Sequence, residues 1–305
     1  MTVTAASPAL LHGVGDRALA WLDDHRDYFR LTPDDFVANA VIERLKPIGE
    51  LALNMRVLFR EGVAGSRQQA RAEQLLDFTW RELLDGGNVL ARLQHDEPIS
   101  PVPLEIYAIF YKLGHRHPGL EAAMRAGRRT LTWTAREMVP NRRLGVLNAE
   151  RNLGLAPSAD FDEAVARTWL GQLPEPWTVQ RHIGYDITHG VFHLTNWGEF
   201  PERIPPEIAD YLTCYLPAWM DDWAELEHWD LLGELLVVDA CLPRPTLDAG
   251  LWERYAAAQS DSGAMPIQGG MPQGDPARVF DLVHHPTLVA TFASAMATSR
   301  AMSAA

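Results

Sequence analysis

Helical spacing of apolar residues along almost the whole chain is the feature that most constrains the fold. In residues 36–51 the apolar side chains recur every three or four positions, and residues 75–84 repeat this spacing. Alternation of polar and apolar residues, which is typical of strands, is scarce. We predict an all-α protein whose helices cover the following ranges: 14–29, 34–62, 66–94, 103–114, 118–138, 141–154, 160–172, 177–195, 206–227, 229–242, 248–258 and 276–298.

Loop signals divide these helices into units of roughly 45 residues. Glycine and proline cluster at 62–66, 97–103, 154–160, 198–206 and 243–250. A helix hairpin of this size cannot bury both of its faces alone, so hairpins stack on one another. We therefore expect stacked helix hairpins that form an α/α toroid or an α-solenoid-like array. We treat 14–300 as a single helical domain, with a scaffold half at 14–154 and a site-bearing half at 160–298. An irregular helical bundle is the alternative.

Charge and cysteine content limit the partners and the compartment. The chain has 27 Lys and Arg against 40 Asp and Glu, a net charge of −13. An acidic surface repels phosphate backbones and anionic lipids, so we expect neither a nucleic acid partner nor a membrane surface. No segment reaches the roughly 20 apolar residues that span a bilayer. With two cysteines and no signal-peptide pattern, we expect a soluble, cytoplasmic protein; its oligomeric state is left open.

Histidine and tryptophan concentrate in the second half of the chain, where we place the site. His189 and His193 lie four residues apart and therefore on one helix face, with Asp186 one turn before His189. Two imidazoles at this spacing can hold a divalent cation, with Asp186 as a third ligand or as the carboxylate that orients a ring. The structural alternative is that Asp186 caps the helix, that His189 is a buried, hydrogen-bonded histidine and that His193 lies at the surface.

Two further places carry candidate chemistry. Asp239 and Cys241 end an apolar helix, where a buried carboxyl group must be paired, bound to a cation or protonated. His285 follows a loop rich in Gly and Pro at 260–275, which we expect to fold over one end of the helices. Each of these residues has a structural alternative, as a helix end, a small buried thiol or a helix cap.

Asp239-x-Cys241, followed by the Gly-Pro loop and His285-x-Thr287, resembles the zinc site of protein prenyltransferase β subunits. Those proteins belong to the α/α-toroid superfamily, together with terpene cyclases. The resemblance covers about 177–298 and implies a toroid fold and one divalent metal, most readily Zn²⁺, held by Asp239, Cys241 and His285. The glycine-rich repeats of the superfamily are mostly missing from this chain.

Two rival motifs lie nearby. Asp221-Asp222-x-x-Glu225 resembles the magnesium motif of class I terpene synthases, although no second metal motif follows in 226–305. The pairs Asp186/His189 and Glu225/His228 resemble the motifs of di-iron helical proteins. Those proteins need two further carboxylates, for which Glu207 or Glu234 is available.

From these residues we predict a biosynthetic enzyme that binds an apolar small molecule or a modified peptide in a Trp-rich cavity. Cyclisation, elimination or isomerisation would proceed by acid–base or metal-assisted chemistry. The predicted catalytic residues are Asp186, His189, Asp239 and His285; the predicted metal ligands are His189, His193, Asp239, Cys241 and His285; the predicted substrate-binding residues are Tyr185, Trp197, Trp219 and Trp223. A non-catalytic helical-repeat binding or scaffold protein is the alternative. A patch of arginines at 125–143 could meet an acidic partner, or it could be a solvated helix face.

Overall fold

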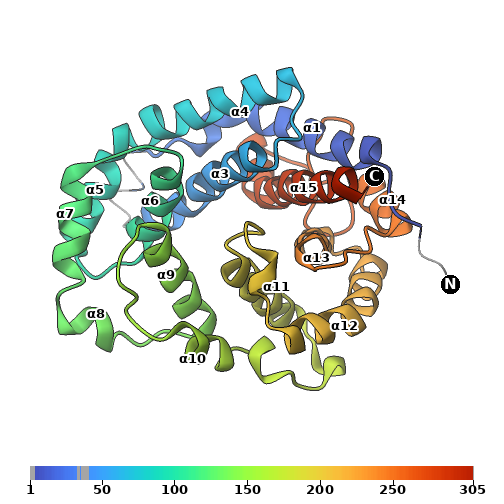
Figure 1. Cartoon of the computed structure of the whole chain (residues 1–305). Helices are drawn as coiled ribbons and strands as arrows, with labels where there is room; N and C mark the ends of the chain where they lie inside the picture. Colours follow the sequence, from blue (N-terminus) through green and yellow to red (C-terminus); the bar gives the residue numbers. More distant parts are fainter. Residues whose placement is uncertain (1–3, 33–34, 36–40, 305) are drawn as a thin grey trace. The chain divides into compact units, whose positions relative to one another are not determined.

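The named elements of the computed structural model are all helices, which confirms the predicted all-α class (Figure 1). The structure describes residues 4–32, 35 and 41–304. The α-helices are α1 (Pro8–Asp24), α3 (Val41–Glu61), α4 (Ser66–Phe78), α5 (Asn88–Asp96), α6 (Val102–Lys112), α7 (Pro118–Gly127), α8 (Leu131–Ala135), α9 (Pro140–Asn152), α10 (Phe161–Ala166), α11 (Arg181–Thr195), α12 (Pro206–Glu225), α13 (Trp229–Cys241), α14 (Ala249–Ala258) and α15 (Pro276–Ala304). The short helical turns are η1 (Arg26–Phe29), η2 (Thr79–Leu83), η3 (Asp85–Gly87), η4 (Leu170–Gln172), η5 (Pro176–Thr178) and η6 (Pro201–Arg203). An isolated bridge between Ala5 and Asp248 is the one β-type pairing among the described residues.

Two predicted helices each divide into two α-helices, and the predicted ranges 14–29, 160–172 and 177–195 each divide into one α-helix and a short helical turn. The range 66–94 divides into α4 and α5, because Gly86 and Gly87 adopt φ values of 63° and 96° and end the helical path. The range 118–138 divides into α7 and α8, where Thr130 accepts the amide of Trp133 as a new N-cap. The first residues of the predicted helix 34–62 lie outside the described residues. Within the part of the chain that the structure describes, no helix is both long enough and apolar enough to cross a lipid bilayer.

The described chain divides into two compact units. The first comprises Met1–Tyr28, Val57–Glu73 and Leu173–Ala305, and the second comprises Phe29–Arg56 and Gln74–Gln172. The boundaries fall within η1, within α3, within α4 and after η4, whereas the sequence divides its two halves between 154 and 160. Compactness follows contacts in space, so a unit need not be continuous in the chain. The toroid and the single domain at 14–300 both remain predictions.

In the first unit, α13 is the central helix. Every residue of Trp229–Cys241 is buried, because α11, α12, α14 and α15 all pack against this helix (Figure 1). Such a helix is expected to be apolar all round, and α13 is apolar except for three acidic residues, Asp230, Glu234 and Asp239. The structure must therefore provide partners for three buried carboxyl groups.

The long helix α15 packs against both α13 and α1. Its contact with α1 is close, because the Gly15 amide donates to Ser294 Oγ at 3.1 Å and Ser294 Oγ donates to the Leu11 carbonyl at 2.6 Å. A Cβ atom at Gly15 would lie 2.2 Å from Ser294 Oγ, so only glycine permits this approach. The α1 contact thereby fixes α15, the helix that carries His285.

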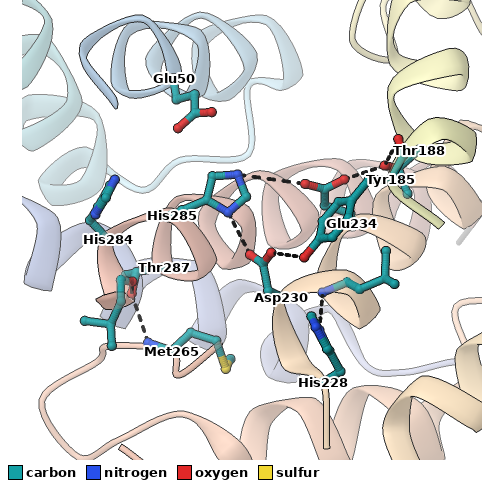
Figure 2. Close-up of polar contacts among 12 residues, drawn as sticks. Glu50, Tyr185, Thr188, His228, Asp230, Glu234, Met265, His284, His285 and Thr287 are labelled. Atoms are coloured by element: carbon teal, nitrogen blue, oxygen red, sulfur yellow. Dashed lines mark hydrogen bonds and ion pairs between the residues drawn. The ribbon is translucent and has the colours of Figure 1, made fainter. Parts of the chain in front are cut away.

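The segment between α14 and α15 is a loop, as predicted, and it is anchored at two points. The Met265 amide donates to Thr287 Oγ1 at 2.9 Å, which ties the loop to α15 (Figure 2). The Ile267 carbonyl accepts the Asp230 amide at 3.1 Å, which ties it to the first turn of α13. Amides in the first turn of a helix have no hydrogen-bond partner within the helix, and the loop supplies one for the Asp230 amide.

Candidate functional site

Asp230, Glu234 and His285 form a cluster between α13 and α15. The two acids lie four residues apart on α13 and face α15, where His285 points between them (Figure 2). His285 Nδ1 lies 2.7 Å from Asp230 Oδ1, and His285 Nε2 lies 3.8 Å from Glu234 Oε1. One potential ligand atom from each residue lies within 4.8 Å of the others. Among the described residues, this is the one group of three or more His, Cys, Asp or Glu with that property.

Helix α11 supplies a hydroxyl donor to the outer oxygen of each carboxyl group. The Tyr185 hydroxyl donates to Asp230 Oδ2 at 2.5 Å, and the Thr188 hydroxyl donates to Glu234 Oε2 (Figure 2). These bonds leave Asp230 Oδ1 and Glu234 Oε1 directed at the imidazole of His285. Three helices therefore contribute to one hydrogen-bonded group.

The two carboxyl groups differ in pKa although both are buried. Burial alone would raise the pKa of Asp230, but the charge of His285 and the hydrogen bonds from His285 and Tyr185 bring it below its ordinary value. Burial raises the pKa of Glu234, and the charge of Asp230 adds to this against the lowering effect of His189 and His285. The cluster thus pairs an ionised carboxylate with a carboxyl group that tends to keep its proton.

Two more histidines border the cluster. His189 Nδ1 lies 2.9 Å from the Tyr185 carbonyl and 3.7 Å from Glu234 Oε2, and 38 % of the His189 side chain is exposed. His228 is the N-cap of α13, where its Nδ1 accepts the Leu231 amide. Burial lowers the pKa of His228 below 6.5, so its ring is neutral at pH 7 and suited to accept this bond.

Access to the cluster is through its histidines. The side chains of Asp230 and Glu234 are 7 % and 4 % exposed, whereas that of His285 is 27 % exposed. An imidazole with one nitrogen bonded to a carboxylate is a base whose ring orientation and tautomer are set. A carboxyl group of raised pKa beside it is a potential acid. Groups whose surroundings drive their pKa values apart are the usual arrangement for acid–base chemistry.

A family model described as a domain of unknown function (DUF6895) matches residues 15–295. The chain belongs to this family. No curated protein and no solved structure matches the chain significantly. The match includes both compact units and all residues of the cluster.

The structure brings three of the predicted residues to the cluster. His285 is at its centre, Tyr185 bonds to Asp230, and His189 lies beside Glu234. Asp186 and His193 lie on α11 but are not members of the three-residue group. His193 instead belongs to a line of ring contacts, with His189 on one side at 6.3 Å and Trp197 on the other at 5.6 Å between centroids.

Asp239 and Cys241 are not members of the group either. Asp239 accepts hydrogen bonds from the Thr246 amide and hydroxyl and from the Leu247 amide, and so fixes the loop after α13. Cys241 is buried with Thr195 Oγ1 at 4.0 Å, and burial raises the pKa of its thiol to about 12. In the absence of a bound metal, a thiol with this pKa stays protonated at neutral pH.

The remaining predicted residues lie outside the cluster. Trp219 donates its indole N–H to the Pro176 carbonyl at 3.0 Å, and Trp223 packs its ring edge-on against His228. In the two rival motifs, Asp221 forms an exposed ion pair with Arg254 at 3.0 Å, and neither motif contributes a complete ligand group among the described residues.

Sequence reasoning missed Asp230 and Thr188 and named Glu234 only as a spare carboxylate. A usable signal was present, because Asp230 and Glu234 stand one helical turn apart in the most apolar helix of the second half. Two acids on one face of a helix that is buried all round require a partner from a neighbouring helix. His285, predicted from the sequence as a site residue after the loop rich in Gly and Pro, is that partner.

Proposed function

We propose that the chain is an enzyme that moves protons on a small molecule or a modified peptide, in an isomerisation, elimination or cyclisation. His285 is the base, Asp230 orients it, and Glu234 is the protonated acid. The observation that carries the proposal is the position of the His285 imidazole, 2.7 Å from an ionised carboxylate and 3.8 Å from a carboxyl group of raised pKa.

The roles follow from the hydrogen bonds. With Asp230 Oδ1 accepting from Nδ1–H, the lone pair of His285 is on Nε2 and faces Glu234. The distance of 3.8 Å between His285 Nε2 and Glu234 Oε1 exceeds the length of a hydrogen bond, so the two groups are not bonded to each other. His285 can therefore abstract a proton from one substrate atom while Glu234 donates a proton to a neighbouring atom. General acid–base catalysis of this kind contributes about 10²- to 10⁴-fold to a rate.

The ring contacts along α11 support a planar or unsaturated substrate. Tyr185, His189, His193 and Trp197 follow one another with centroid separations of 6.5, 6.3 and 5.6 Å. The first two rings border the cluster, and the line continues from it through His193 to Trp197, which follows the end of α11. Aromatic faces also stabilise a cation that develops during cyclisation.

Solvent deuterium labelling tests the proposal without a known substrate. The purified protein is incubated in D₂O with metabolite fractions, and deuterium incorporation is followed by mass spectrometry. We expect one compound class to gain deuterium, and His285→Asn and Glu234→Gln to reduce its labelling at least 100-fold. Asp221→Asn, in an exposed ion pair, is the matched control and keeps the wild-type rate. Labelling that is unchanged in His285→Asn would exclude this site, and no labelling of any fraction would favour the scaffold alternative.

Metal-assisted catalysis is the second candidate, because Asp230, Glu234 and His285 place potential ligand atoms within 4.8 Å. Two carboxylates and an imidazole suit Zn²⁺, Mn²⁺ or Fe²⁺, and hydroxyl donors on the outer oxygens, here Tyr185 and Thr188, are typical of groups that orient metal ligands. A bound cation would act as a Lewis acid or lower the pKa of a water molecule.

Elemental analysis and calorimetric titration with Zn²⁺ and Mn²⁺ separate the two candidates. If a cation binds in the cluster, His285→Asn and Glu234→Gln weaken its affinity at least 10-fold. Asp239→Asn and Cys241→Ser test the ligand set that the sequence predicts, and we expect them to leave the affinity unchanged. Deuterium labelling that persists in metal-free protein would favour acid–base catalysis alone.

A further inference from the structure

The arginine-rich patch at 125–143 belongs to the second compact unit, and five of its six arginines fall into two groups. Three arginines are paired with carboxylates: Arg125 with Glu121, Arg128 with the buried Glu150, and Arg142 with Glu105. The charges of these three are largely neutralised where they stand. The patch as a whole is therefore less basic than its sequence indicates.

Arg136 and Arg143 form the second group, because each donates to a backbone carbonyl. Arg136 Nη1 donates to the Ile99 carbonyl, and Arg143 Nη2 donates to the carbonyl of Arg136. Neither guanidinium group has an ion-pair partner among the residues that the structure describes. These bonds fix the side chains of two half-buried arginines and leave their charge without a contacting carboxylate among the described residues.

The electrostatic surroundings make an anion favourable at this place. Burial lowers the pKa of Arg136, and the charges of Arg142 and Arg143 lower it further, against Glu105 and Glu97. A lowered pKa means that the surroundings of Arg136 disfavour its positive charge. An anion between Arg136 and Arg143 would offset this effect.

Both side chains line a cavity of about 400 Å³ among α8, α9 and α10. This volume is within the range of small-molecule sites. Half-buried Met138 and buried Ala164 add an apolar part to the wall. Of the acids at the rim, Asp160 accepts the Glu163 amide as the N-cap of α10, and Glu163 is paired with Arg167. Glu137 is exposed.

We propose that this cavity binds a small organic anion, whose phosphate or carboxylate group contacts Arg136 and Arg143 and whose apolar part packs on Met138 and Ala164. Guanidinium groups suit both oxyanions, because their N–H donors match two oxygens at once. The start of α9 adds to the positive field, since its N-cap Val139 provides no side-chain acceptor and Pro140 stands at its first position. The site is independent of the proton-transfer cluster, which belongs to the other unit.

Calorimetric titration with phenyl phosphate, benzoate and benzyl alcohol at constant ionic strength tests the proposal. We expect at least one of the two anions to bind at least 10-fold more tightly than the neutral alcohol, and the tighter of the two identifies the anionic group. Removing one charged hydrogen-bond donor should weaken binding roughly 10-fold or more, so Arg136→Gln and Arg143→Gln should both show this loss. Arg125→Gln, which removes a paired arginine outside the cavity, is the control and keeps the wild-type affinity.

The bonds of Arg136 and Arg143 to backbone carbonyls also stabilise the local chain, so stability is measured in parallel. Arg143→Lys keeps the charge but not the fork of donors, and we expect an affinity between those of wild type and Arg143→Gln. The proposal is overturned if the wild type binds the anions no better than the alcohol. It is equally overturned if the Gln variants lower the melting temperature while the anion affinity stays unchanged.

Discussion

Asp230 Oδ1 lies 2.7 Å from Nδ1 of His285, a residue 55 positions further along the chain. The bond links the buried helix α13 to α15 and compensates a carboxylate in the core of the first unit. It also selects the imidazole tautomer, because Nδ1 must carry a proton to donate to a carboxylate. Structure and proposed chemistry therefore depend on the same contact.

Asp230→Asn should change this tautomer. If the oxygen of the Asn side chain accepts the hydrogen bond from the Tyr185 hydroxyl, the amide N–H₂ of the same side chain faces His285 Nδ1. Nδ1 must then accept a hydrogen bond, so the imidazole proton moves to Nε2. We expect the deuterium-labelling rate to fall about 10³- to 10⁴-fold, as in hydrolase triads whose Asp is replaced by Asn. Long-range ¹⁵N–¹H correlation spectra of the imidazole report the tautomer. A wild-type tautomer in the variant would contradict the assigned role of Asp230.

Glu234→Gln should make stability less dependent on pH. Burial raises the pKa of Glu234 above 4.5 in the folded state, so the folded chain retains this proton at pH values where the unfolded chain has lost it. The stabilising contribution is fully present below pH 4.5 and is lost as the pH rises through the folded pKa. The loss in the free energy of unfolding is about 1.4 kcal/mol for every pKa unit by which the folded chain exceeds the unfolded chain at Glu234. Urea denaturation between pH 4 and pH 8 measures this slope. The free energy of unfolding should fall less steeply with rising pH in Glu234→Gln than in the wild type. Equal slopes would show that Glu234 ionises normally in the folded chain.

Asp239→Asn should destabilise the first unit without affecting the cluster. Asp239 Oδ1 accepts from Thr246 and Oδ2 accepts from the Leu247 amide, so an Asn would turn an amide N–H₂ toward one of these donors. An unsatisfied buried donor costs about 1–3 kcal/mol. Chemical denaturation gives the loss, while the labelling rate of the folded variant should equal that of wild type. A large loss of labelling would reassign Asp239 to the site.

Gly233→Ala should destabilise the contact between α13 and α14. A Cβ atom at Gly233 would lie 2.3 Å from the Tyr255 hydroxyl and 2.7 Å from Val289 Cγ1. Overpacking of this kind costs about 1–3 kcal/mol, which exceeds the helix-propensity gain of about 1 kcal/mol for Ala over Gly. The free energy of unfolding from denaturant titration is the measurement.

Tyr255→Phe completes this test. The buried Tyr255 hydroxyl has no hydrogen-bond partner among the described residues, so its removal should leave stability unchanged or raise it by up to about 1–3 kcal/mol. Because the hydroxyl is the atom closest to the new Cβ, Gly233→Ala should cost less in the Tyr255→Phe background. Additive effects of the two substitutions would show that the backbone adjusts instead.

The local sequence contains enough information for the helices and for several single residues. Apolar spacing is set within one or two helical turns, so it predicts the all-α class. The glycine pair Gly86-Gly87 is also a local feature. Glycine can adopt positive φ values but does not have to, so the sequence alone does not predict that the helix breaks there. Tyr185, His189 and His285 stand out by residue type alone.

The partners of those residues were decided only by the tertiary structure. Asp230 and Glu234 become exceptional because α11, α12, α14 and α15 bury α13 on all sides, and that burial is a long-range property. The same packing brings His285 to Asp230, while the chain that follows α13 supplies the donors that satisfy Asp239. The sequence by itself therefore determined the all-α class and singled out His285, Tyr185 and His189 by residue type. The tertiary structure decided which carboxyl group meets an imidazole, because desolvation and pairing depend on neighbours that are distant in the chain.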